Sequence, residues 1–493
     1  MTGCDHWFNV AENLFLRNIA NPVIWLGDNC LKDKAIKTFS GDVLCMDEYV
    51  HYPHNIELSK ISLRDSGFFL SDNYLRAKDR CLKMMDRIDH FGLLTRIDRE
   101  TYFNQLTCHF IELIEKNNPS ALVMAEAPHS HAQYLLFEIS QYFNLEIAWF
   151  NNWMIGPIMN LQDMRTMEYV PRLNLELRNL LRPYESLVDK YLAEINLKWI
   201  GEFEHQYMLD QRNSLKLRAF LNNLIRQKIP ELIKLFYINF KSKINKKYNP
   251  VNPYNLSPLT LKKIKRKRYK NLVYHNKLFS NHDIPEDKFV YFALHYEHER
   301  TTNPDGGIYH DQFIAIQSLR AFIPDEIMIV VKEHPSQFYL KDRGSKGRSP
   351  LFYKLLSRIH GIKLVNSDID SCDIQKRAVL TATITGTAAL EAAMNNKVAI
   401  IFGNAWFKGC PNVFEFNKLT SFEDLENYQP MNLKSISTFL KNRLYDFCIP
   451  ANQNASAEKR NRSLLKPNFL TDQEICILDL LMSFFKNIEN NET

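Results

Sequence analysis

Short apolar runs alternate with stretches of helical spacing in two separate parts of the chain. In the first part the strand-sized runs are residues 23–27, 43–46, 121–126 and 147–150. In the second part they are residues 288–294, 327–334, 362–365, 378–384 and 398–403. Apolar strands that alternate with helices indicate parallel sheets covered on both faces. The pattern therefore predicts an α/β protein with two doubly wound, Rossmann-like domains.

The predicted domain boundaries follow this pattern. We expect an N-terminal domain over residues 1–165 and a C-terminal domain over residues 281–450. Residues 166–280 are expected to form a helical insertion and a linker, because Asn-Pro and Ser-Pro pairs interrupt regular structure near its end. Residues 451–493 are expected to form a C-terminal helix and a tail.

The composition is that of a globular protein, with 45% hydrophobic and 24% charged residues. The N-terminus has no basic and apolar leader, and no apolar run approaches the ~20 residues of a membrane-spanning helix. Nine scattered cysteines without a CxxC pair indicate reduced thiols, rather than disulfides or a zinc site. These features predict a cytoplasmic protein.

A strongly basic segment interrupts this ordinary composition. Residues 211–280 contain 18 Lys or Arg and a single acid, Glu231. Apolar residues recur at helical spacing among the cations: Leu217, Phe220, Leu224, Ile225, Leu232, Leu235 and Phe236. This pattern favours docking on an anionic membrane surface, at the inner face of the cell membrane, over an ordinary amphipathic face. Nucleic acid is the least favoured partner, because no recognition module accompanies the charge.

Thr385, Gly386 and Thr387 stand between an apolar strand and the helical stretch that follows it. Ligands of open parallel sheets bind beyond the C-terminal ends of strands, and a helix N-terminus attracts phosphate. Gly386 lets the backbone approach a ligand, and the two hydroxyls add donors. The sequence thus predicts a phosphate-binding turn, although a simple helix cap explains the same residues.

Lys332, His334 and Pro335 end another apolar strand of the same half. Lys332 can neutralise a phosphate, and His334 can bind a phosphate or protonate a leaving oxygen. Pro335 would fix the turn that aims His334. The alternative for His334 is a structural role.

Residues 294–307 follow the first strand of this half and are rich in side chains that recognise sugars and carboxylates. Arg300 offers a planar fork that suits a carboxylate. Tyr296 and Asn303 are further candidates for donor binding. The alternative is a solvated surface loop.

In the N-terminal half, Glu126 closes the strand 121–126, and His129 and His131 follow it. A carboxylate with two nearby imidazoles can act as a general base or a nucleophile. We therefore expect these residues, together with Asp28 after the first strand, on the acceptor side of an active site. The alternative is that Glu126 caps the next helix.

Together, these motifs resemble the capsule polysaccharide biosynthesis family, which includes bacterial Kdo transferases. The resemblance is carried by KFVYFALHYEHERTTNPDGGIYHDQFIAI (288–316), VVKEHPSQF (330–338) and TATITGTAALEAAMNNKVAIIFGNAW (381–406). It implies a GT-B fold, in which two Rossmann-like domains face a cleft and the C-terminal domain holds a nucleotide sugar. By this resemblance, His334 and Pro335 match a His-Pro donor motif, and residues 385–387 match a phosphate-binding turn.

The resemblance implies a glycosyltransferase that builds bacterial capsule or surface polysaccharide from CMP-Kdo or another CMP-ulosonic acid. Arg300 would then bind the donor carboxylate, and the acceptor would be a glycan or a lipid-linked glycan. No metal and no cofactor other than the nucleotide-sugar co-substrate is expected, because protein groups can stabilise the leaving phosphate. The alternatives are a GT-B-like epimerase, a polyol-phosphate transferase, or a non-catalytic scaffold for polysaccharide synthesis or export.

Overall fold

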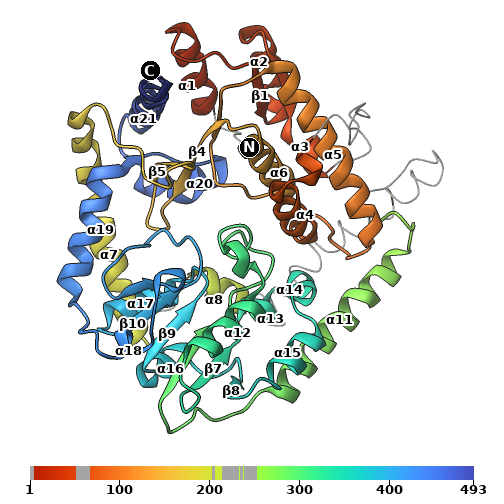
Figure 1. The fold of residues 1–493 in the computed structure, drawn as a ribbon, viewed down its shortest axis with the longest axis vertical. Coiled ribbons are helices and arrows are strands. Elements are labelled where there is room, and N and C mark those ends of the chain that lie inside the picture. Colours follow the sequence, from red (N-terminus) through yellow and green to blue (C-terminus); the bar gives the residue numbers. More distant parts are fainter. Residues whose placement is uncertain are drawn as a thin grey trace. The chain divides into compact units, whose positions relative to one another are not determined.

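The computed structural model describes residues 5–51, 67–202, 206–213, 233, 237 and 252–492 (Figure 1). These residues form two compact units. Unit 1 contains residues 1–88, 95–191 and 438–493, and unit 2 contains residues 89–94 and 192–437. The chain therefore returns to unit 1 after unit 2, which differs from the expected boundaries. The predicted insertion 166–280 is divided between the units, and the predicted membrane residues between Leu217 and Phe236 lie outside the described residues.

Unit 2 is built on a six-stranded sheet in the order β11-β10-β9-β6-β7-β8, and every pairing in it is parallel. Its strands are β6 (Phe289–Ala293), β7 (Met328–Lys332), β8 (Ile362–Val365), β9 (Leu380–Thr383), β10 (Val398–Ile401) and β11 (Val413–Glu415). Its helices are α8 (Gln206–Asn213), α11 (Pro258–Phe279), α12 (Gln312–Phe322), α13 (Ser336–Tyr339), α14 (Lys341–Gly347), α15 (Pro350–Leu356), α16 (Ser371–Arg377), α17 (Thr387–Met394) and α18 (Glu423–Glu426). The first five strands lie where the apolar runs predict them.

The strands of this sheet are apolar because both faces are covered. Alternate residues of β6 enter two different cores: Val290 and Phe292 pack on one face, and Phe289 and Tyr291 on the other. This two-sided burial is the arrangement that continuous apolar strands predict. The doubly wound prediction is confirmed for this half of the chain.

Unit 1 contains two separate sheets. The strands β1 (Ile24–Gly27) and β2 (Asp42–Cys45) form a parallel pair, and a four-stranded sheet has the order β12-β5-β4-β3. The strands of this second sheet are β3 (Ala121–Met124), β4 (Glu146–Asn152), β5 (Ile158–Asp163) and β12 (Cys448–Pro450). Its helices are α1 (Asp5–Leu16), α2 (Lys32–Thr38), α3 (Met46–His51), α4 (Asp72–Met84), α5 (Arg96–Asn117), α6 (His131–Tyr142), α20 (Ala455–Asn461) and α21 (Phe469–Glu492).

Two strands of unit 1 are absent from the predicted pattern. β5 is antiparallel to β4, and β12 is antiparallel to β5. β5 carries Asn160 and Gln162 among its apolar residues, and β12 has only three residues, so neither gives a continuous apolar run. The remaining helices, α7 (Arg182–Trp199) and α19 (Leu433–Phe447), each contain a boundary between the units.

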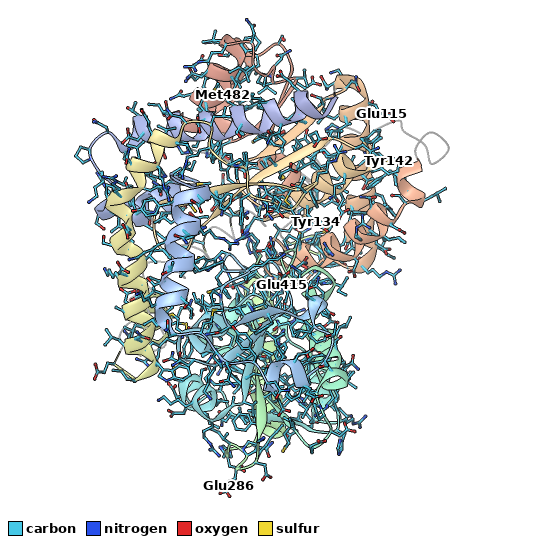
Figure 2. The ribbon with its side chains drawn as sticks, turned by 60° about the vertical axis from the view of Figure 1, so that its left-hand side comes forward. Glu115, Tyr134, Tyr142, Glu286, Glu415 and Met482 are labelled. Atoms are coloured by element: carbon cyan, nitrogen blue, oxygen red, sulfur yellow. The ribbon has the colours of Figure 1, made fainter. Side chains whose placement is uncertain are left out.

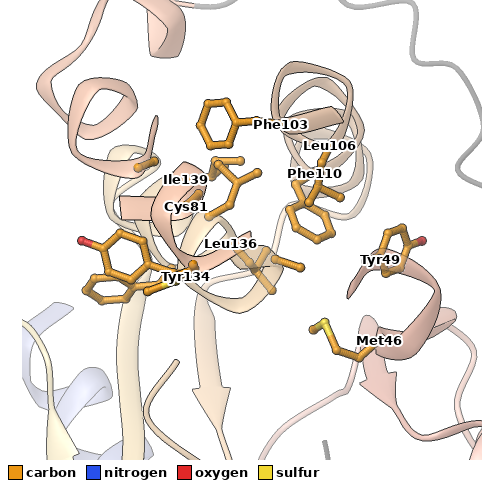
Figure 3. Close-up of a cluster of buried hydrophobic side chains, with 14 of the residues drawn as sticks. Met46, Tyr49, Cys81, Phe103, Leu106, Phe110, Tyr134, Leu136 and Ile139 are labelled. Carbon is orange, nitrogen blue, oxygen red and sulfur yellow. The ribbon is translucent and has the colours of Figure 1, made fainter. Parts of the chain in front are cut away.

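The main core of unit 1 lies between α4, α5 and α6 on one side and the strands on the other. Figure 3 shows Phe103, Leu106 and Phe110 of α5 facing Leu136 and Ile139 of α6. Capping boxes fix the first turns of both helices, through Thr95 and Asp98 in α5 and through Ser130 and Gln133 in α6. The start of α6 is therefore set by its own sequence, which places the residues just before it at the end of β3.

Side chains fill both units, as Tyr134 in unit 1 and Glu415 in unit 2 illustrate (Figure 2). Within the described part of the chain, no helix has both the length and the hydropathy to cross a bilayer. The GT-B expectation also includes a cleft between the two domains, and that part of it stays a prediction.

Candidate functional site

The sheet of unit 2 has a topological switch point between β6 and β9. From β6 the chain proceeds through β7 and β8 on one side, and β9, β10 and β11 follow on the other side. Because all pairings are parallel, the C-terminal ends of these strands lie along one edge of the sheet. Open α/β sheets bind their ligands in the crevice outside the C-terminal ends at such a point. The predicted residues after β6, β7 and β9 all belong to this edge.

His295 follows β6 and connects it to the end of β9. Its Nε2 accepts a hydrogen bond from the backbone N–H of Thr385 at 3.1 Å, and the backbone N–H of His295 donates to Oε1 of Gln312 at 2.7 Å. Burial lowers the pKa of His295 to about 4, so the ring is neutral at physiological pH. His295 therefore fixes the switch point as a neutral hydrogen-bond acceptor. The sequence analysis did not single it out.

The turn between β9 and α17 divides into a structural part and a half-exposed part. Thr385 uses its amide for His295, and its hydroxyl donates to the carbonyl of Thr301 at 2.7 Å. Both groups therefore hold the turn together, and the predicted role of Thr385 as a ligand donor stays a prediction. Gly386 and Thr387 are half-buried and open α17, where the first N–H groups have no partner within the helix.

Position 386 requires glycine because two neighbouring atoms leave no room for a side chain. A Cβ atom at this position would lie 2.8 Å from Oγ1 of Thr383 and 3.2 Å from Nε2 of His295. Both atoms belong to the hydrogen-bonded framework of the switch point, so neither can move away cheaply. Gly386 thus brings the start of α17 close to His295.

Lys332, the last residue of β7, is a buried cation without an ion-pair partner in the part of the chain that the structure describes. The residue is 4% exposed, and its Nζ donates to Oγ of Ser371 at 2.7 Å. Burial lowers the pKa of Lys332 to about 8, while nearby Asp370 acts in the opposite direction. A buried positive charge is costly unless it is paired, so this site favours an anion.

His334 presents one ring nitrogen as a donor. Its Nδ1 accepts the backbone N–H of Ser336 at 3.1 Å, which places the proton of the neutral ring on Nε2. Burial and the nearby cations lower the pKa of His334 to about 3. Pro335 precedes the short helix α13 directly, as the turn prediction requires. His334 is therefore a neutral N–H donor rather than a charged acid in the unliganded protein.

Lys198, near the end of α7, is a further cation at this site that the sequence analysis missed. Its Nζ lies 2.6 Å from Oε1 of Glu391, a buried residue on α17. The Oγ1 of Thr387 lies 3.4 Å from the same oxygen. Lys198 also lowers the pKa values of Lys332 and His334 by charge repulsion, which places it within electrostatic reach of both. It was missed because it falls in the expected insertion, far from any strand end in sequence.

A buried ionic network supports the loop after β6. Arg348 pairs with Glu333 at 2.9 Å and with Glu297 at 3.2 Å, and the hydroxyl of Tyr353 donates to Glu333 at 2.9 Å. Arg348 also donates to the backbone carbonyl of His295 at 2.9 Å. These side chains bind one another within the protein and therefore orient the site.

The loop candidates Arg300, Asn303 and Tyr296 are less available than expected. Arg300 forms an ion pair with Asp305 at 3.1 Å, so its guanidinium group already binds a carboxylate of the protein itself. Asn303 is 2% exposed, and Tyr296 is 6% exposed with its pKa raised to about 12 by burial. The expected roles of these three residues in donor binding stay predictions.

In unit 1, Glu126 follows β3 and is held by two side-chain amides. Gln133 of α6 donates to Oε1 at 3.4 Å, and Gln453 donates to Oε2. The predicted partnership with two imidazoles is therefore corrected. His131 is 1% exposed, its ring packs edge-on against Tyr102, and burial lowers its pKa to about 3. His129 is exposed and makes no hydrogen bond to Glu126.

Glu126 and Gln133 also line a cavity of about 550 Å³ in unit 1. The cavity lies beside β1 and β3, which belong to different sheets, and its other lining residues are mostly apolar and come from α1, α5, α6 and α21. Asp28 follows β1, and burial raises its pKa. Glu126 therefore has a free volume beside it, which Asp28 does not line.

No family model and no curated protein matches the chain in sequence. The solved structures that it resembles include two of Thermosulfurimonas dismutans KpsC, one described as a beta Kdo 2,7 transferase and the other as a beta Kdo 2,4 transferase. The first is 13% identical over 36% of this chain and 52% of its own length, and the second is 11% identical over 65% and 78%, both with TM-scores of 0.24. The chain thus spans about half the length of the first.

A UDP-GlcNAc 2-epimerase from Methanocaldococcus jannaschii is also similar, at 14% identity over 90% of this chain and 98% of its own, with a TM-score of 0.19. Another structure of that epimerase is in complex with UDP-GlcNAc and UDP. With TM-scores this low, the chemistry of this chain has to be argued from its own residues.

Proposed function

We propose that this protein is a glycosyltransferase that binds the phosphate of a nucleotide sugar at the switch point of unit 2. The observation that carries the proposal is the buried, unpaired Lys332 at the C-terminal end of β7. It lies in the same edge of the sheet as the N–H donor of His334 and the N-terminus of α17. Cationic and N–H groups of this kind stabilise the negative charge that develops on a departing phosphate.

In the proposed reaction, the bond between the anomeric carbon and the phosphate oxygen breaks, and its electron pair stays on the phosphate. Lys332, the Nε2–H of His334 and the first amides of α17 interact with this charge. Lys198 contributes a second positive charge, which Glu391 keeps in place. Glu126 takes the proton of the acceptor hydroxyl as that oxygen attacks the anomeric carbon, or attacks the carbon itself if configuration is retained.

We assign the donor to the CMP-activated ulosonic acids, of which CMP-Kdo is one, because of the motifs that end in His334-Pro335 and Thr385–Thr387. The acceptor is a glycan or a lipid-linked glycan. Peripheral attachment at the inner face of the cell membrane, which brings such an acceptor within reach, is part of this proposal.

Product analysis with CMP-, UDP- and CDP-linked donors tests the function directly. Transfer of the sugar with release of CMP supports the proposal. An isomerised nucleotide sugar would instead identify an epimerase, and transfer of a polyol phosphate would identify a phosphotransferase. Nucleotide binding without any turnover would favour a scaffold.

A further inference from the structure

The outward face of α11 is a cationic surface. Six exposed lysine and arginine side chains on this helix form no ion pair with any described residue: Lys262, Lys263, Arg266, Lys267, Lys270 and Lys277. The helix contains no aspartate or glutamate over its 22 residues. Its surface charge is therefore uniform in sign, and a complementary partner must be an anion.

The opposite face anchors α11 to unit 2. Leu261 and Leu272 are each 1% exposed, and the helix packs on α14 and α15 (Figure 1). Arg268, which lies on this inner side, donates to the carbonyls of Phe91 and Gly92 at 2.6 and 3.1 Å. Lys265 is half-buried, with its Nζ 4.5 Å from the centre of the Phe91 ring. Two cations are thus used inside the unit, and the other six are left on the solvent side of the helix.

Large apolar side chains are exposed among these six cations. Leu259, Tyr274 and Leu278 are 64%, 61% and 56% exposed. Leu259, Lys263, Arg266, Lys270, Tyr274 and Lys277 are separated by three or four residues in turn, which places them on one face of a helix. A soluble polyanion offers nothing to bury these side chains, whereas the boundary between lipid headgroups and acyl chains suits both kinds of residue.

We propose that this face of α11 docks the protein onto an anionic lipid bilayer. The cations contact the headgroups, and Leu259, Tyr274 and Leu278 enter the interface between headgroups and chains. The purpose of docking, which is to hold the enzyme near a lipid-linked acceptor, rests on the proposed function. Docking itself is measurable without donor, acceptor or turnover.

The experiment is vesicle co-sedimentation of the full chain at low salt. Vesicles of phosphatidylcholine alone are compared with vesicles that also contain phosphatidylglycerol. We expect binding only to the anionic vesicles and a decline with added salt. The triple variant Lys262→Glu, Arg266→Glu and Lys270→Glu should weaken binding by a factor of about 100 or more, because each cation near the surface contributes about fivefold to the affinity.

The matched control reverses three exposed cations of unit 2 outside α11, in Lys288→Glu, Lys354→Glu and Lys434→Glu. This variant has the same net charge and should bind within about threefold of the unaltered protein, because the charges of α11 carry the attraction. Equal losses in both variants would reduce docking to non-specific charge attraction and overturn the proposal.

A second control addresses the apolar residues. The variant Leu259→Ser and Leu278→Ser should bind anionic vesicles more weakly at moderate salt, while its binding to soluble heparin stays unchanged. Unchanged vesicle binding in this variant, or binding to heparin without binding to vesicles, would identify a soluble polyanion as the partner instead. Because docking needs no turnover, failure of the catalytic proposal and failure of this one are distinguishable.

Discussion

The backbone N–H of Thr385 donates to Nε2 of His295 at 3.1 Å and so connects the ends of β9 and β6 across the switch point of unit 2. The bond requires an unprotonated Nε2, and burial ensures this by lowering the pKa of His295 to about 4. The first amide of the turn is consequently unavailable to a ligand. The turn can bind an anion only through Gly386, Thr387 and the amides that follow.

Replacing His295 tests this framework. In His295→Ala the amide of Thr385 loses its partner inside the protein, and an unsatisfied buried donor costs about 1–3 kcal/mol. We expect the free energy of unfolding to fall by that amount in urea titrations, with a loss of nucleotide affinity. The control His360→Ala removes an exposed histidine and should have little effect. Equal stability of the two variants would contradict the framework.

The pKa of Lys332 predicts opposite pH dependences for stability and for ligand binding. Its value falls from the usual 10.5 to about 8 on folding, so the unfolded chain binds more protons between these values. Stability of the unliganded protein therefore rises with pH from about 8 to 10.5, by up to about 3 kcal/mol. Affinity for an anionic nucleotide falls over the same range, because Lys332 loses its charge.

The variant Lys332→Met isolates this effect. It should show neither the rise in stability nor the fall in affinity above pH 8, and its nucleotide affinity should already be low at pH 7. Urea titrations and nucleotide titrations at several pH values measure both quantities. Parallel pH profiles in the two proteins would show that Lys332 is not the group responsible.

His334 is predicted to act as a neutral donor throughout the physiological range. Since its pKa is about 3 in the unliganded protein, His334 contributes no change in kcat/KM near pH 6.5, where an ordinary histidine titrates. His334→Ala should lower kcat by about 10²–10³, the usual cost of losing one donor to a developing charge. A pH–rate profile and single-variant kinetics measure these effects. Undiminished turnover in His334→Ala would end this assignment.

Glu126 is predicted to depend on Gln453 for its orientation. Glu126→Gln should abolish transfer, because the amide can neither accept the proton nor form a covalent intermediate. Gln453→Ala should lower kcat while leaving the KM for the donor unchanged, since the donor is assigned to unit 2. Lys459→Ala, which replaces an exposed residue of α20, provides the control. A change in donor KM without a change in kcat would contradict this role of Gln453.

Much of the site in unit 2 was predictable, because its residues come directly after strands in the sequence. Lys332 and His334 come directly after an apolar run, and Gly386 precedes a helix, so their common edge follows from parallel pairing. The charged residues that act on these site residues come from distant parts of the sequence. Lys198 lies on a helix of the expected insertion, and no local pattern indicates that it pairs with Glu391.

In unit 1 the sequence was less informative for a related reason. Gln453 reaches Glu126 from a segment more than 300 residues away, which follows the three-residue strand β12. His131 was predicted beside Glu126 because it is close in sequence. However, the first turn of α6 directs its side chain into the core. Proximity in sequence was a poor guide where a helix begins.

The central claim is that the switch-point edge of unit 2 holds the phosphate of a nucleotide. The most direct test is calorimetric titration of CMP, UMP, GDP and cytidine into the unaltered protein, and of CMP and cytidine into Lys332→Met and Lys198→Ala. We predict that CMP binds the unaltered protein more tightly than UMP, GDP or cytidine, and that both variants lose affinity for CMP but not for cytidine. Equal affinity for CMP in all three proteins would contradict the claim.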